Sequence, residues 1–158
     1  MAGATLYVDV DDSKFRDALS RVRGTLDRDG MQPLLERIGN HLFNSTRARA
    51  EQQVAPDGTP WAALSPRYQR RKAKIYPGRR ILQREGHMLG DRLNYQVTDG
   101  TLLLGTSGLS KGGYAYPVAH QFGRGPVRAR PFLGLSLADE EAVLTIVEHH
   151  LGDALNAD

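Results

Sequence analysis

The chain has 158 residues, of which 40% are hydrophobic and 25% are charged, and it contains no cysteine. This balance is ordinary for a globular protein, and the length suits one domain over residues 1–158. Without cysteine the chain cannot form disulfides or thiolate metal sites. No apolar run approaches the roughly 18 residues of a membrane span, and the first ten residues lack a signal-peptide core. These features are compatible with the bacterial cytoplasm, and we expect no membrane partner.

The net charge of +3 conceals a strong separation of charge along the chain. Residues 30–130 hold sixteen Lys and Arg against six Asp and Glu, a net charge of +10. Residues 131–158 hold six acidic residues and no Lys or Arg, a net charge of −6. Charge separation of this kind concerns partners rather than fold, so it predicts surfaces that make charged contacts.

The first 55 residues predict one strand followed by two helices. Residues 1–12 hold the strand, because apolar and polar side chains alternate there, and residues 13–55 hold the helices. The second helix is expected to begin near Pro33, because a proline in the first turn lacks only a donor that has no partner there. Its predicted apolar stripe is Leu34, Leu35, Ile38, Leu42 and Thr46.

Residues 56–92 form a basic segment of loop and helix. Trp61 follows a loop containing Gly and Pro, and an isolated Trp in this position is more often a core residue than a ligand-stacking one. Ser65-Pro66 suits the cap and first turn of a short helix over 66–75. A further short helix is expected over 81–93.

Residues 93–136 are predicted to hold a hairpin and an edge strand. Asp99-Gly100 separates two short strand-like runs, and this pair is typical of a tight turn in which both residues take positive φ. Residues 127–133 alternate as a strand does, and Pro131 restricts that strand to a sheet edge because it lacks a donor.

Glycines and prolines at positions 123–126 predict a forced bend between the two halves of this stretch. Such a bend would bring Phe122 and Phe132 together. We therefore expect both rings to be largely buried, with Trp61 close by.

Residues 137–158 are predicted to form the C-terminal helix. Ser136 followed by Asp139 three residues later fits a capping box. The expected buried stripe is Leu144, Val147, Leu151 and Leu155. The predicted fold class is α+β: a small, mainly antiparallel sheet with a central hairpin and an edge strand, packed against several helices that include this long one.

Motifs for catalysis are absent from the sequence. It has no phosphate-binding loop, no dinucleotide glycine pattern and no HExxH motif. Glu85 and His87 are two residues apart, so they do not face one another on a helix. We therefore expect no enzyme, no catalytic or metal-binding residue and no cofactor.

Eight cations lie within 18 residues that contain no acid, and we call them the basic cluster: Arg67, Arg70, Arg71, Lys72, Lys74, Arg79, Arg80 and Arg84. One interpretation is a solvated surface, and a second is contact with nucleic-acid phosphates, which needs no base-reading motif. A third is docking onto the C-terminal helix of a neighbouring copy. The acidic residues available there are Asp139, Glu140, Glu141 and Glu148. The docking interpretation gives both charged regions a partner.

Two motifs late in the chain carry a family resemblance. The first is His120-Gln121-Phe122-Gly123, and the second runs from Ala129 through Arg130, Pro131 and Phe132 to Ser136. Upstream, Trp61, Pro66 and Tyr68 extend the same pattern. In this order the residues resemble the signature of the phage virion morphogenesis family, the tail-completion proteins of tailed phages.

The resemblance implies a structural virion protein that completes the tail and joins it to the head, as a neck or tail-terminator ring of six copies. Its implied partners are further copies of itself, the head–tail connector and the tail tube proteins, with non-specific DNA contact in the lumen. It would assemble in the bacterial host's cytoplasm and end in the virion. The alternative is a stand-alone basic nucleic-acid-binding protein without a virion role.

Overall fold

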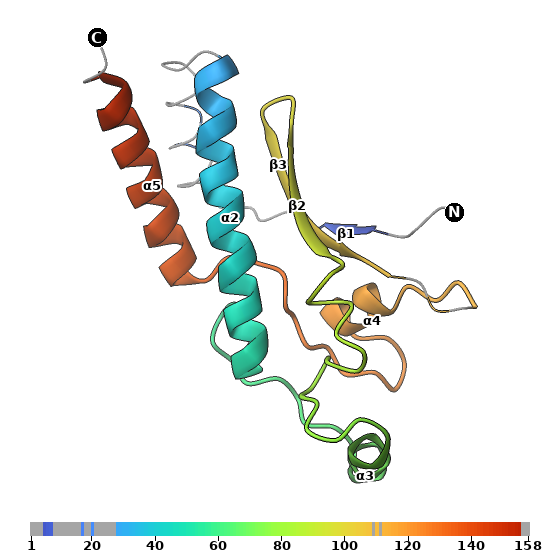
Figure 1. The fold of residues 1–158 in the computed structure, drawn as a ribbon. Coiled ribbons are helices and arrows are strands. Elements are labelled where there is room, and N and C mark those ends of the chain that lie inside the picture. Colours follow the sequence, from blue (N-terminus) through green and yellow to red (C-terminus); the bar gives the residue numbers. More distant parts are fainter. Residues whose placement is uncertain are drawn as a thin grey trace.

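Figure 1 shows the computed structural model of the protein, which describes residues 5–7, 17, 20, 28–108, 110 and 112–155. Helices and strands occupy separate stretches of the chain, and the predicted α+β class is confirmed. Most of the strand and the first helix predicted before residue 28 lies outside the described residues. The elements are β1 (Thr5–Tyr7), α2 (Arg28–Gln52), α3 (Pro66–Ile75), β2 (Leu93–Thr98), β3 (Thr101–Ser107), α4 (Tyr116–Phe122) and α5 (Leu137–Leu155).

The three strands form one antiparallel sheet in the order β1-β3-β2. β2 and β3 pair along the whole of β2, which leaves Asp99 and Gly100 as the turn between them. These two residues have φ angles of 50° and 71°, as a tight hairpin turn requires. The predicted hairpin is therefore confirmed.

The long helix α2 lies between the sheet and α5, so that the three form successive layers (Figure 1). It begins at Arg28, earlier than predicted, and includes Pro33. Burial of the neighbouring leucines offsets the one donor that a proline lacks. α2 approaches the hairpin closely at Gly39, where an added Cβ would lie 2.4 Å from the Tyr95 ring. The predicted stripe is confirmed as buried: Leu34, Leu35, Ile38, Leu42 and Thr46.

Two apolar clusters hold the layers together. One joins α2 to α5 and includes Leu34, Ile38, Leu42, Val143 and Val147. The other lies around the end of α2 and the start of β2, and it includes Trp61, Met88, Leu89, Leu93, Phe132 and Leu133. The second cluster confirms Trp61 and Phe132 as neighbouring core residues.

α5 begins with the predicted capping box. The backbone N–H of Asp139 donates to the Ser136 hydroxyl over 3.1 Å, and the backbone N–H of Ser136 donates to the Asp139 carboxylate over 2.9 Å. Each side chain thus pairs a backbone donor that the first turn of a helix leaves without a partner. The helix start is where the sequence placed it.

The buried stripe of α5 differs from the predicted one at Leu144, which is 38% exposed. Val143 is fully buried in its place, and Val147 is buried as predicted. The reason is that Asp139 faces the interior, and residues at steps of four along a helix share a face. Leu151 packs partly against the core, and the side chain of Leu155 lies outside the described residues.

Two predicted elements are wrong. Residues 81–92 form turns rather than a helix, because Leu82 and Gly86 take positive φ angles of 58° and 86°. Residues 127–133 form no strand, apart from one isolated bridge between Arg124 and Val127. The backbone N–H groups of Arg130, Phe132 and Leu133 donate to His120 and Gln121 of α4 instead of to a neighbouring strand.

Phe122 is the other error, because its side chain is 62% exposed rather than buried. The bend itself is present: Gly123 and Gly125 have positive φ angles, and Arg124 and Val127 exchange two backbone hydrogen bonds. The preceding residue, Gln121, takes the inward position on α4. Adjacent helical residues point about 100° apart, so Phe122 is turned to the surface.

We predict that Phe132→Ala lowers the free energy of unfolding by about 3–5 kcal/mol, because it empties a fully enclosed aromatic site. Phe122→Ala is the matched control and should change it by no more than about 0.5 kcal/mol. Urea unfolding of both variants measures this. Equal losses for the two would contradict the packing described here.

Candidate interaction surfaces

The motif residues of α4 and the chain after it are joined by the amide of Gln121. Its Oε1 accepts the backbone N–H groups of Phe132 and Leu133 over 3.0 and 3.1 Å, and its Nε2 donates to the Leu133 carbonyl over 2.9 Å. The amide thereby serves as the hydrogen-bonding partner that an adjacent strand would otherwise provide. It fixes the second motif against the first.

Arg130 is buried and ties the same segment to the loop after Trp61. Its Nε donates to the Ala62 carbonyl over 2.7 Å and its Nη2 to the Ala63 carbonyl over 3.1 Å. Trp61 donates from Nε1 to the Pro131 carbonyl over 2.7 Å. These groups satisfy backbone carbonyls inside the protein, so this part of the motif builds the fold.

The bend after α4 depends on Gly123. Its φ is 78°, and an added Cβ would lie 3.1 Å from the backbone nitrogen of Ala129. A side chain here would be strained by the backbone angle and crowded by the returning chain. The bend therefore explains the glycine of the first motif.

A groove of about 660 Å³ lies between α3, residues 82–88 and α4. His120 lines it, and its buried Nδ1 has no hydrogen-bond partner among the described residues. Burial lowers the pKa of this imidazole, and the charge on Arg130 lowers it further, so the ring is neutral at pH 7. Within the part of the chain that the structure describes, no group of His, Asp and Glu could hold a metal ion.

Most of the basic cluster covers α3 and the chain just after it. Ser65 caps α3 by accepting from the Tyr68 N–H, as predicted, and Tyr68 itself is 45% exposed. Arg84 lies over the Tyr76 ring at 5.3 Å and donates to its hydroxyl over 2.9 Å. The exposed members are Arg67, Arg70, Arg71, Lys74, Arg79, Arg80 and Arg84.

Lys72 does not belong to this exposed surface. Its side chain is buried, and Nζ donates to the Arg80 carbonyl. Burial lowers the pKa of Lys72, with a further contribution from the charge on Arg130. The prediction that Lys72 contacts DNA or a neighbour is therefore wrong, because on α3 it faces the interior while Arg71 before it and Lys74 after it face solvent.

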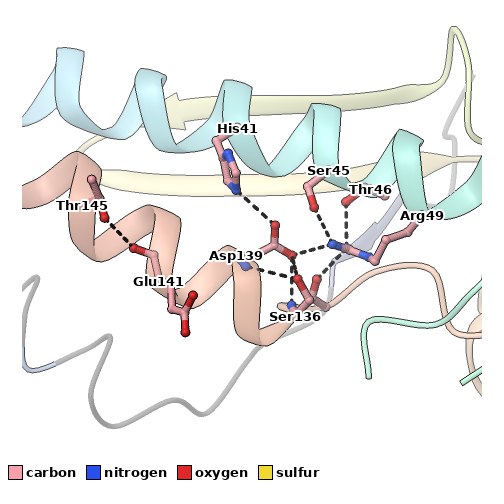
Figure 2. A network of polar contacts seen from close by, with 9 residues as sticks. His41, Ser45, Thr46, Arg49, Ser136, Asp139, Glu141 and Thr145 are labelled. Atoms are coloured by element: carbon pink, nitrogen blue, oxygen red, sulfur yellow. Dashed lines mark hydrogen bonds and ion pairs between the residues drawn. The ribbon is translucent and has the colours of Figure 1, made fainter. Parts of the chain in front are cut away.

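The predicted acidic docking surface is also divided by the structure. Asp139 is only 1% exposed, so it cannot dock onto a neighbour. Figure 2 shows its carboxylate between α2 and α5, where Arg49 donates to Oδ2 over 2.5 Å and His41 Nε2 lies 3.1 Å from Oδ1. Glu141 and Glu148 are exposed, and Glu140 is half-buried.

Sequence reasoning missed Arg49 and His41, although a signal was present. His41, Ser45 and Arg49 recur every four residues on α2, directly beside the apolar positions Leu42 and Thr46. Polar residues at that spacing share one side of a helix. A polar line bordering a buried stripe indicates an internal polar network, and its buried acidic partner was the capping residue of α5.

Comparison with known proteins gives one match. A family model described as the phage virion morphogenesis family matches residues 10–152. No curated protein and no solved structure matches the chain. No helix in the described part of the chain is long and apolar enough to cross a membrane.

We predict that Asp139→Ala lowers the free energy of unfolding by about 3–5 kcal/mol, because it leaves the buried Arg49 guanidinium without its anion. Glu141→Ala is the control on the same helix. Because Glu141 is exposed, this change should alter the free energy of unfolding by no more than about 0.5 kcal/mol. Chemical denaturation at pH 7 measures both. A small loss for Asp139→Ala would mean that Arg49 finds water or another acceptor.

The stability that Asp139 contributes should also depend on pH. Burial alone raises its pKa, but hydrogen bonds from Ser45 and Ser136 and the charge on Arg49 outweigh burial, so the pKa of Asp139 is lowered in the folded protein. A lowered folded pKa means that the stabilisation is complete above the unfolded pKa of about 3.9 and is lost as pH falls through the folded value. The stability difference between the natural protein and Asp139→Asn should therefore shrink below about pH 4.

Proposed function

Because the chain belongs to the phage virion morphogenesis family, we propose that it completes the tail of a tailed phage and joins it to the head. The family gives the chain a structural role in building the virion. The finer assignment is a ring-forming neck or tail-terminator component, placed where tail and head meet. Its partners are further copies of itself, the head–tail connector and the tail tube.

The observation that carries the ring is the placement of opposite charge on different elements. The exposed Arg124 and Arg128 follow α4, whereas the exposed Glu141 and Glu148 lie on α5, and α2 lies between α4 and α5 (Figure 1). A ring needs heterologous contacts, in which one surface of each copy meets a different surface of the next. Opposite charges at such contacts fix orientation and register. A ring of six copies would suit a six-fold tail tube.

We assign the basic cluster to DNA in the lumen of this ring rather than to the acidic helix of a neighbour. Two of the groups that the docking interpretation needed, Asp139 and Lys72, are buried inside the subunit. Five of the remaining cations are exposed within the eleven residues 70–80. Clustered guanidinium and ammonium groups bind phosphates without reading bases, which suits DNA that must pass through at any sequence.

A complementation experiment tests the virion role. Phage particles made without this chain should accumulate as separate heads and tails, and supplying the chain should restore joined particles. Electron microscopy of particles carrying a labelled chain should place the label at the neck. Particles that lack the label, with DNA binding retained by the isolated chain, would instead support the stand-alone nucleic-acid-binding protein.

The lumen assignment predicts a salt-sensitive affinity for duplex DNA. The slope of log K against log[salt], where K is the association constant for duplex DNA, should be about −0.9 for each phosphate contacted. Arg70→Glu with Arg71→Glu should weaken binding and flatten this slope by about two units. Arg37→Glu with Arg47→Glu, which reverses two exposed arginines on α2, is the matched control for net charge. Equal effects of the two pairs would contradict the assignment.

A further inference from the structure

An apolar patch lies on the outer side of α4. Phe122 is 62% exposed and Val118 is 39% exposed, and they are four residues apart on one face of the helix. Tyr114, four residues earlier, is 38% exposed and lies against the Arg124 guanidinium at 5.5 Å. Arg128 is exposed just after the bend. The α4 patch is therefore an apolar surface with an arginine border.

A second apolar stripe runs along the outer side of α5. Leu137 is 78% exposed and Leu144 is 38% exposed, and they are separated by two helical turns. Glu141 and Glu148 are exposed at the intervening and following positions of the same face. This α5 stripe lies opposite the buried face that begins at Asp139. It alternates leucine with glutamate.

The α4 patch and the α5 stripe complement each other in apolar surface and in charge. Each presents large apolar side chains of the kind that globular proteins more often bury. Arginines border the α4 patch, and glutamates border the α5 stripe. Within one subunit they do not meet, because α2 lies between α5 and the part of the chain that holds α4 (Figure 1). A second copy is the partner that offers the matching surface.

We infer that the α5 stripe of one copy docks onto the α4 patch of the next copy, an inference that rests on the ring proposed above. The leucines cover Val118 and Phe122, while Glu141 and Glu148 meet Arg124 and Arg128. Because the two surfaces differ, the contact is heterologous and repeats around a ring. It also leaves the basic cluster on α3 free to face the lumen.

Charge argues against each surface pairing with itself. Two α5 stripes packed together would bring glutamates against glutamates, and two α4 patches would bring arginines against arginines. Like charges brought together in this way penalise the two-fold dimers, whereas the crossed contact pairs every charge with its opposite. The same surfaces therefore favour ring closure over a simple dimer.

Cross-linking between copies tests the contact, and the natural absence of cysteine makes the design simple. Phe122→Cys and Leu137→Cys are placed on separate, differently tagged chains, and a short bis-maleimide linker is applied to purified particles containing both. We expect a product carrying both tags. Ile75→Cys replaces Phe122→Cys in the control, since Ile75 is 54% exposed on α3 and no partner is assigned to it.

Three results would overturn the contact: no mixed product, a stronger product between Ile75→Cys and Leu137→Cys, or products between identical chains alone. The second would mean that α5 docks onto the basic cluster. Each of these three results is interpreted only in particles that contain the chain. If the chain is missing from particles altogether, the proposed function fails, and this inference fails with it.

A charge exchange gives an independent readout. Glu141→Arg with Glu148→Arg, and separately Arg124→Glu with Arg128→Glu, should each lower the yield of joined particles about tenfold or more. Combining the four changes should recover much of that loss, because the opposite signs then face each other again. Unchanged melting temperatures of the isolated variants would show that folding is intact. No recovery in the combined variant would overturn the pairing of these residues.

Discussion

The buried carboxylate of Asp139 determines how α5 sits on the rest of the molecule. It accepts from the backbone at the start of its own helix and from Arg49 on α2, so one side chain both begins α5 and orients it. With Asp139 turned inward, Val143 and Val147 must follow it into the core. The leucines and glutamates of the opposite side then have no place except the surface. The same contact that holds the helix therefore decides which residues it offers to others.

At the other end of the molecule, the amide of Gln121 has a comparable role. It replaces a strand as the partner of the chain around Phe132, and by pointing inward it leaves Phe122 pointing outward. Gln121, Arg130 and Phe132 of the family motif are buried and hold the fold together, whereas Phe122 is the most exposed large hydrophobic side chain of the motif. A motif that mixes buried polar groups with an exposed aromatic ring is what a protein needs when one short helix must be both rigid and available for contact.

The elements that local chemistry specifies were predictable from the sequence. The hairpin follows from Asp99-Gly100, α3 from Ser65-Pro66, and the start of α5 from its capping box, because each signal lies within a few residues. The errors came from partners far along the chain. The sequence predicts Asp139 as an exposed acid because its partner Arg49 lies 90 residues earlier, and the polar spacing on α2 does not identify which acid pairs with it. Alternation predicts a strand over 127–133 because it does not reveal that a side-chain amide will accept the hydrogen bonds of that segment.

The close approach of α2 to the hairpin at Gly39 has a consequence for assembly. The α4 patch lies on the side of α2 that faces the hairpin (Figure 1), whereas the α5 stripe lies on a helix that α2 holds through the Asp139 contact. At Gly39 the Tyr95 ring packs directly against the α2 backbone, so a side chain there would push α2 away from the hairpin. In a closed ring the angle between one docking surface and the other fixes how sharply successive subunits turn. In the proposed ring, a single methyl group at position 39 would therefore change the angle between successive subunits, far from the surfaces proposed to join them.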